Sequence, residues 1–180
     1  EMGYNCFLAE YRGYGMSSGA PELGKMLADV EKIMAAIGQP PEELVLFGRS
    51  VGSIFAIHAA SLFPQAAGLI LESGIADPLE RLLMRIRPEE LGVDMESLRR
   101  VANQDLNHEK KLSQFRNPAL ILHTRFDGLV DLSNGERLHA WIQGPKKLTI
   151  FEAGDHNSIL FTNAREYFQL MQDFLDSLTD

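Results

Sequence analysis

The chain alternates short, continuous apolar runs with segments of helical periodicity. Five runs have strand length and too few polar positions for one solvent-exposed face: residues 5–10, 44–47, 68–72, 119–123 and 147–151. Continuous apolar runs of this kind are typical of strands that are buried on both faces of a parallel sheet. Because helical segments separate the runs, the pattern predicts an α/β domain with a mainly parallel sheet and flanking helices.

Two of the segments between the runs predict helices from apolar spacing alone. From Leu23 to Ile37 apolar residues recur at steps of three and four, and Gly38 followed by Pro40 ends that helix. Residues 51–62 predict a second, largely apolar helix. Both helices follow the order expected of strand–helix–strand units.

Two later helices are predicted from their starts. Ser133 with Glu136, and Asn163 with Glu166, have the spacing of a capping box. The large apolar side chains of these helices are interpreted as core residues rather than as parts of a cofactor site. They are Trp141, Phe168, Met171, Phe174 and Leu175.

The stretch 75–117 differs from the rest of the chain. It is charged, contains helical fragments such as residues 79–86, and lies between two predicted strands where a simple crossover needs far fewer residues. We interpret it as a small helical insertion in one domain that spans residues 1–180.

Composition narrows the class of protein. A chain of 180 residues with 45% hydrophobic residues is long enough for one domain with a sizeable core. A formal net charge of −8 gives no basic footprint for nucleic acid or for an anionic membrane surface. The one cysteine, Cys6, has no partner for a disulfide or a metal site and is predicted to be a buried, unreactive thiol. The sequence predicts no metal and no cofactor.

Membrane and secretion signals are not apparent in this sequence. No apolar stretch approaches the roughly 18 residues needed to span a bilayer. Residues 1–15 lack the charged-then-apolar layout of a signal peptide. We therefore expect a cytoplasmic protein.

The candidate chemistry lies in the segment Gly48-Arg49-Ser50-Val51-Gly52, between a predicted strand and a predicted helix. A G-x-S-x-G sequence in this context predicts a nucleophile elbow, in which a strained turn exposes the serine Oγ at a helix N-terminus. We expect both glycines to be needed because side chains two positions from the serine would collide in so sharp a turn. The alternative is a tight turn with a structural role only.

A serine nucleophile requires a histidine base at the same edge of the sheet. His58 lies within the helix that follows the elbow, His139 lies within a later helix, and His108 lies in the insertion, so all three are poor candidates. His123 ends a strand and is predicted to order the loop that follows it. His156, in a loop just after the last strand, is the predicted base.

The base in turn requires a carboxylate to orient it. Asp127 follows the strand that ends at His123, which puts its carboxylate at the right edge of the sheet. Asp131 and Asp155 are rivals, but Asp131 precedes a capped helix and Asp155 is the immediate neighbour of His156. Asp127 is therefore the predicted acid.

At this point the sequence resembles a known family, the α/β-hydrolases, and within it the small serine hydrolases of the Bem46-like type. The chain order of serine, acid and histidine is the order expected of that architecture. The resemblance covers nearly the whole chain in five blocks: "AEYRGYGMSSG", "LVLFGRSVGS", "GLILESG", "ALILHTRFDGLV" and "EAGDHNSI".

The resemblance implies a triad of Ser50, Asp127 and His156, with the backbone N–H of Val51 as one oxyanion donor. Glu10 stands where such proteins more often have Asp, a departure that affects packing rather than chemistry. The function implied is a serine hydrolase that cleaves a small-molecule carboxylic ester, thioester or amide through an acyl-enzyme. Haloalkane or epoxide chemistry on the same fold would require a carboxylate in place of the serine.

The insertion occupies the family's lid position, and its small size implies an open site. Its arginines are interpreted as a solvated helical face, with recognition of an anionic substrate as the alternative. These arginines are Arg81, Arg85, Arg87, Arg99 and Arg100.

The family's sheet begins with three strands that precede residues 5–10, and their loop normally supplies the second oxyanion donor. The resemblance therefore implies an N-terminally truncated domain whose open slot is filled by direct pairing of strands 5–10 and 44–47, by a strand from a partner, or not at all. An exposed sheet edge of this kind could support a homo-oligomer. A scaffold of the same fold with impaired catalysis is the alternative function.

Overall fold

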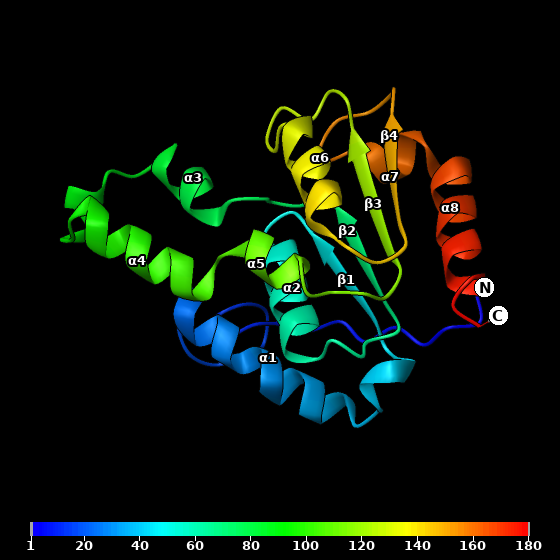
Figure 1. The fold of residues 1–180 in the computed structure, drawn as a ribbon, viewed down its shortest axis with the longest axis horizontal. Coiled ribbons are helices and arrows are strands. Elements are labelled where there is room, and N and C mark those ends of the chain that lie inside the picture. Colours follow the sequence, from blue (N-terminus) through cyan, green and yellow to red (C-terminus); the bar gives the residue numbers. More distant parts are fainter. Residues whose placement is uncertain (1, 180) are drawn as a thin grey trace.

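A parallel sheet of four strands organises the computed structural model, which describes residues 2–179. The strands lie in chain order across the sheet (Figure 1). This arrangement confirms the predicted α/β class and four of the five predicted strands. They are β1 (Val45–Arg49), β2 (Gly68–Glu72), β3 (Ala119–Thr124) and β4 (Lys146–Phe151).

The prediction of a strand at residues 5–10 is wrong. The segment is extended but forms no ladder, and its side chains are exposed, with Leu8 at 84%. Cys6, predicted to be buried, is exposed for the same reason. An apolar run becomes a strand only where a neighbouring strand takes its backbone groups, and direct pairing with β1 does not occur. Among the described residues, β1 is therefore an edge strand.

Helices cover one face of the sheet (Figure 1), and a short 3₁₀ turn precedes β1. Gly38 ends the first helix in the left-handed region at φ +68°, as the sequence predicted. The apolar stripe of that helix is buried against the neighbouring helix and the sheet. The elements are α1 (Leu23–Ile37), η1 (Pro41–Glu43), α2 (Gly52–Leu62) and α6 (Leu132–Trp141).

The opposite face is covered by α7 (Ile159–Thr162) and α8 (Ala164–Asp176). Tyr4 donates a hydrogen bond to the carbonyl of Leu175, so the two ends of the described chain lie side by side. Of the predicted core residues, Leu175 is buried and most others are partly buried, but Phe168 is 51% exposed. Phe168 lies one helical step beyond Tyr167, which takes the buried position.

The predicted capping boxes do not form, although both helices do. Asp131, not Ser133, is the N-cap of α6, and its carboxylate accepts the Ser133 N–H at 2.9 Å. The side-chain amide of Asn163 donates to the carbonyls of Ala153 and Ile159. Asn163 joins α7 to α8, where these carbonyls compete for its side chain.

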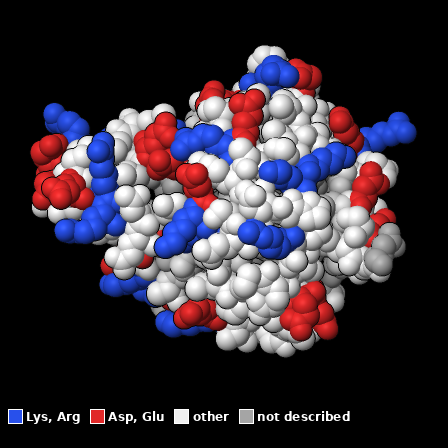
Figure 2. All heavy atoms as spheres, viewed as in Figure 1, with Lys and Arg blue, Asp and Glu red and all other residues white. Residues whose placement is uncertain are grey.

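The predicted insertion is helical, and α3 and α4 extend from the sheet as an arm (Figure 1). Its base is attached to the sheet layer, because Leu112 of α5 lies in the core and Arg137 of α6 forms an ion pair with Glu80 at 2.7 Å. Figure 2 shows basic and acidic side chains interspersed over the arm, in keeping with a solvated face. The elements are α3 (Pro78–Leu83), η2 (Pro88–Leu91), α4 (Met95–Asp105) and α5 (His108–Leu112).

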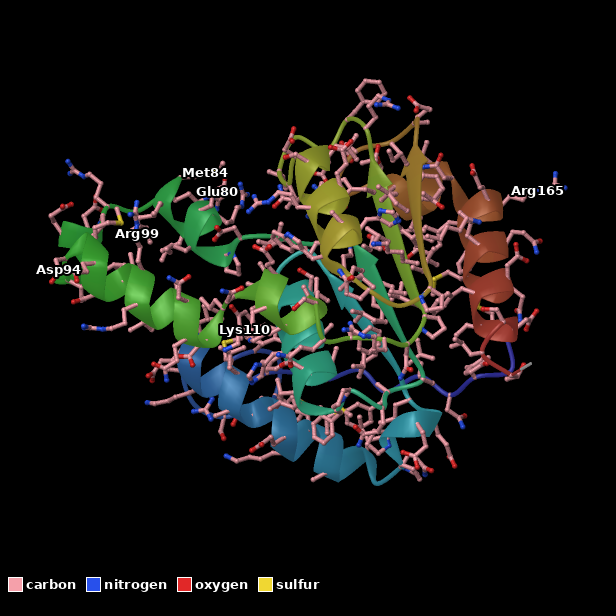
Figure 3. The ribbon with its side chains drawn as sticks, in the orientation of Figure 1. Glu80, Met84, Asp94, Arg99, Lys110 and Arg165 are labelled. Atoms are coloured by element: carbon pink, nitrogen blue, oxygen red, sulfur yellow. The ribbon has the colours of Figure 1, made fainter. Side chains whose placement is uncertain are left out.

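A hollow of about 440 Å³ lies on the arm. Figure 3 labels three residues that line it: Glu80 of α3, Met84 just after α3, and Arg99 of α4. Met84 is 67% exposed, so the hollow is shallow and open. No helix in residues 2–179 is long and apolar enough to cross a bilayer.

Candidate active site

Ser50 occupies a sharp turn between β1 and α2. Its φ is +50°, a region that costs a residue with a Cβ about 1–2 kcal/mol. The Ser50 N–H donates to the carbonyl of Glu72 at 2.9 Å, which attaches the turn to the end of β2. Ser50 therefore has the positive φ and the place between a strand and a helix that an elbow requires.

The two glycines of the turn differ in what they contribute. A Cβ at position 48 would lie 2.7 Å from both the Cα of Ser53 and the Cβ of Ala56, so Gly48 is required for close approach of β1 to α2. A Cβ at position 52 would meet nothing within 4 Å. The expectation that Gly52 also prevents a collision is wrong, because α2 turns its first residue toward open space.

The structure brings together the three side chains predicted to form a triad. His156 Nε2 lies 3.0 Å from Ser50 Oγ, and His156 Nδ1 lies 2.8 Å from Asp127 Oδ2. His156 and Asp127 are buried, whereas Ser50 is partly exposed. The three residues therefore form a hydrogen-bonded chain from an interior carboxylate to an accessible hydroxyl.

Asp127 is held in its ionised form by hydrogen bonds. Burial raises the pKa of the carboxyl group, but the Val130 N–H, His156 and the Leu129 N–H donate to it, and the net effect holds the pKa below its usual range. The two backbone donors lie 2.7 and 2.9 Å from Oδ1. An acceptor-only carboxylate beside Nδ1 keeps the proton of neutral His156 on Nδ1 and leaves Nε2 free to accept the Ser50 proton.

The other histidines have different roles. His123 is fully buried, and its Nε2 donates to the Val130 carbonyl at 2.8 Å, so it orders the loop after β3 as predicted. His58 contacts the Lys111 ammonium at 2.8 Å, and His108 contacts the Ile75 carbonyl at 2.9 Å. None of these three side chains is hydrogen-bonded to Ser50.

The two rival carboxylates, Asp131 and Asp155, accept hydrogen bonds from backbone N–H groups of the residues that follow them. Asp131 caps α6, and Asp155 accepts the N–H groups of Asn157 and Ser158. Hydrogen bonds from Ser133 lower the pKa of Asp131, and those from Ser158 lower the pKa of Asp155. Neither carboxylate is hydrogen-bonded to His156, which leaves Asp127 as its partner.

The turn after Ser50 leaves a backbone donor accessible. Val51 is 55% exposed, and its N–H is taken by none of the hydrogen bonds found among residues 2–179. Val51 is the N-cap of α2. The partial positive charge of the helix N-terminus therefore favours an anion near this N–H. The Val51 N–H can therefore serve a developing oxyanion.

Sequence reasoning missed a polar network beneath the triad. Arg49, the residue between Gly48 and Ser50, forms an ion pair with Glu72 and contacts the backbone of His156. Tyr167 donates to the same Glu72 at 2.6 Å. The signal available in the sequence was a glutamate that ends an otherwise apolar strand, because a buried carboxylate requires partners.

A second hollow, larger than the one on the arm, is not lined by these residues. It has a volume of about 750 Å³ and lies between the extended segment 7–12 and α1, where it includes Asp29 and Ile33. None of Ser50, Asp127 and His156 lines it. We place the candidate chemistry at the elbow, because the aligned side chains and not the size of a hollow define a reactive centre. Among the described residues, no cluster of three or more metal-ligating side chains is present.

Comparison with known proteins supports the assignment of the fold. No protein-family model matches the chain. It is 27% identical over 175 residues to alpha/beta hydrolase domain-containing protein 17B of Homo sapiens, which covers 95% of this chain and 56% of that protein. The crystal structure of a lipase-esterase related protein from Clostridium acetobutylicum matches with a TM-score of 0.68 and 20% identity, over 95% of this chain and 84% of that one. Alpha/beta hydrolase domain-containing protein 10 from mouse matches with a TM-score of 0.71 and 20% identity, over 94% and 76%.

The chain has the α/β-hydrolase fold, and the predicted resemblance to the α/β-hydrolase superfamily is confirmed. The narrower Bem46-like type stays a prediction. The chain spans about half the length of the curated relatives it matches.

Proposed function

We propose that this protein is a serine hydrolase that cleaves a carboxylic ester, thioester or amide. The observation that carries the proposal is the continuous hydrogen-bonded chain from Asp127 through His156 to Ser50, with distances of 2.8 and 3.0 Å. Neighbours of the same fold include an esterase domain and a monoacylglycerol lipase. The half-exposed elbow favours a substrate that approaches from open solvent.

The proposed reaction has two halves with balanced proton transfers. Ser50 Oγ attacks the acyl carbon while its proton passes to His156 Nε2, and the carbonyl oxygen becomes an oxyanion beside the Val51 N–H. His156 then protonates the leaving group, whose bond to the acyl carbon breaks, and an acyl-enzyme remains. Water attacks this ester with His156 again as the base, which releases the carboxylic acid and restores Ser50 Oγ–H.

Asp127 is proposed to act through His156 rather than to accept a proton. Its carboxylate fixes the proton on Nδ1 and stabilises the imidazolium that forms in each half-reaction. The hydrogen bonds that hold its pKa below the usual range keep it ionised at neutral pH. This role requires that the Asp127 carboxylate both orients the His156 ring and carries a negative charge.

The test compares a substitution of Ser50, just before α2, with a substitution of a second serine near the end of α2. Ser50→Ala is expected to abolish both hydrolysis of p-nitrophenyl acetate and covalent labelling by a fluorophosphonate. Ser61→Ala is the matched control, because its hydroxyl donates only to the His58 carbonyl within α2. Hydrolysis by Ser50→Ala at the rate of the unmodified chain would contradict the proposal, whereas correct folding without any labelling of the unmodified chain would favour a binding scaffold.

A further inference from the structure

Polar side chains follow one another along the carboxyl ends of three neighbouring strands. Arg49 ends β1, Glu72 ends β2 and Thr124 ends β3. Strand alternation puts Arg49 on the face of Val45, Glu72 on that of Ile70, and Thr124 on that of Leu122, and these apolar residues pack in the cluster covered by α8. The row therefore lies on the α8 face of the sheet, beneath the loop that bears His156.

Arg49 joins this row to the loop. Its Nε donates to Glu72 Oε1 at 2.7 Å, and its Nη2 donates to the carbonyl oxygen of His156 at 2.6 Å. The planar guanidinium holds both acceptors at fixed relative positions, which a lysine ammonium on a flexible stem cannot do. The strand of the nucleophile and the backbone of the base are thus joined by one side chain.

A hydrogen bond from α8 holds the side chain of Glu72 in place. Its side chain is 4% exposed, and its second oxygen accepts the Tyr167 hydroxyl at 2.6 Å. Burial and the hydrogen bond to Glu72 raise the pKa of Tyr167, which remains a donor at all ordinary pH values. Because both oxygens of the Glu72 carboxylate accept hydrogen bonds, the carboxylate is held in a fixed position against Arg49.

Thr124 adds a second attachment of the same loop. Its hydroxyl donates to the Gly154 carbonyl at 2.8 Å, two residues before His156. Gly154 itself adopts φ +84°, so the chain turns sharply between the end of β4 and the base. Arg49 is the attachment that acts on the backbone of His156 itself.

We propose that Arg49 is a positioning residue, which fixes the backbone of His156 so that Nε2 meets Ser50 Oγ, with Glu72 and Tyr167 as its support. The proposal rests on the proposed serine hydrolase function for its kinetic consequence, but the contact itself can be tested without it. Because misplacement of a catalytic group by about 1 Å can cost on the order of 10²-fold in rate, loss of Arg49 is expected to lower kcat roughly 10- to 100-fold.

A purely structural role for Arg49 predicts a different pattern. Its side chain is 42% exposed, so its ion pair with Glu72 contributes little net stability, while its removal leaves the buried Glu72 carboxylate without a cation. Structural loss alone would lower the unfolding free energy and the amount of folded protein. It would not change kcat of the folded fraction.

The experiment compares Arg49→Ala with Arg125→Ala, and adds the double variant R49A/E72Q to remove the unpaired buried charge. Arg125 is the matched control, since it also pairs with a glutamate, Glu152 at 2.6 Å, and its side chain is 48% exposed. Kinetics of p-nitrophenyl acetate hydrolysis give kcat and KM, with and without added methylguanidinium. Hydrogen–deuterium exchange of residues 153–158 reports on the loop directly.

Arg49→Ala and the double variant are expected to lose kcat with little change in KM, to regain part of it with methylguanidinium, and to exchange faster over residues 153–158. Arg125→Ala is expected to show none of these effects. Unchanged exchange of the loop in Arg49→Ala would overturn the proposal even if the chain proves inactive. Faster exchange with kcat unchanged would also overturn it, whereas retained activity in Ser50→Ala would overturn the proposed function alone.

Discussion

The two glycines of the elbow offer a sharp test of its geometry, because they share a motif but differ in their surroundings. In Gly48→Ala the new Cβ would lie 2.7 Å from the Ser53 Cα, which is a backbone atom and cannot rotate away. The first turn of α2 must therefore shift from β1. Overpacking of this kind typically costs about 1–3 kcal/mol of unfolding free energy. The same shift moves Ser50, which lies between the two elements, so the proposed ester hydrolysis should slow as well.

In Gly52→Ala the new Cβ meets nothing within 4 Å, and position 52 is the first residue of α2. Alanine reduces the conformational entropy of the unfolded chain, so this variant should be neutral or more stable by roughly 0.4–1 kcal/mol. Urea denaturation of both variants gives the free energies, and ester hydrolysis gives the activities. Equal destabilisation by the two substitutions would refute the argument from the space around each glycine.

Two further predictions concern titratable groups. Asp127→Asn should lower kcat by about 10⁴-fold in the ester assay, because an amide N–H facing Nδ1 favours the wrong tautomer of His156, and near-normal turnover would exclude the proposed role. For His108, burial lowers the pKa from 6.5 to about 4. Between pH 6.5 and 4 the folded state therefore binds fewer protons than the unfolded state. His108 alone should therefore lower the unfolding free energy by roughly 3 kcal/mol as the pH drops from 6.5 to 4. His108→Gln should reduce that slope in acid denaturation curves, and an unchanged slope would show that His108 does not titrate in this way.

The features that sequence reasoning recovered depend on local patterns. Apolar runs identified β1 to β4, and the G-x-S-x-G spacing between a strand and a helix located the turn at Ser50. The ends of parallel strands meet at one edge of a sheet, so Asp127 after β3 and His156 after β4 could be expected near that turn. The structure brings their side chains within hydrogen-bond distance.

The features that sequence reasoning missed depend on contacts between segments that are distant in the sequence. Residues 5–10 have the apolar pattern of a strand, but pairing requires an adjacent strand, and Cys6 is exposed where none is present. The orientation of α8 decides whether Tyr167 or Phe168 faces the sheet, and both are aromatic. The surroundings of Gly52 depend on where α2 lies. No local signal distinguishes these outcomes.

The register of β1 against β2 connects Ser50 to His156. Arg49 is the register partner of Glu72, and the next residue, Ser50, donates its N–H to the Glu72 carbonyl. Glu72 thus holds the serine by its backbone and, through Arg49, the carbonyl of His156 by its side chain. A slip of this strand pair by one residue would turn Glu72 to the opposite face and separate both contacts at once. The distance between Ser50 and His156 therefore depends on the rigid sheet as well as on the loops that bear the two residues.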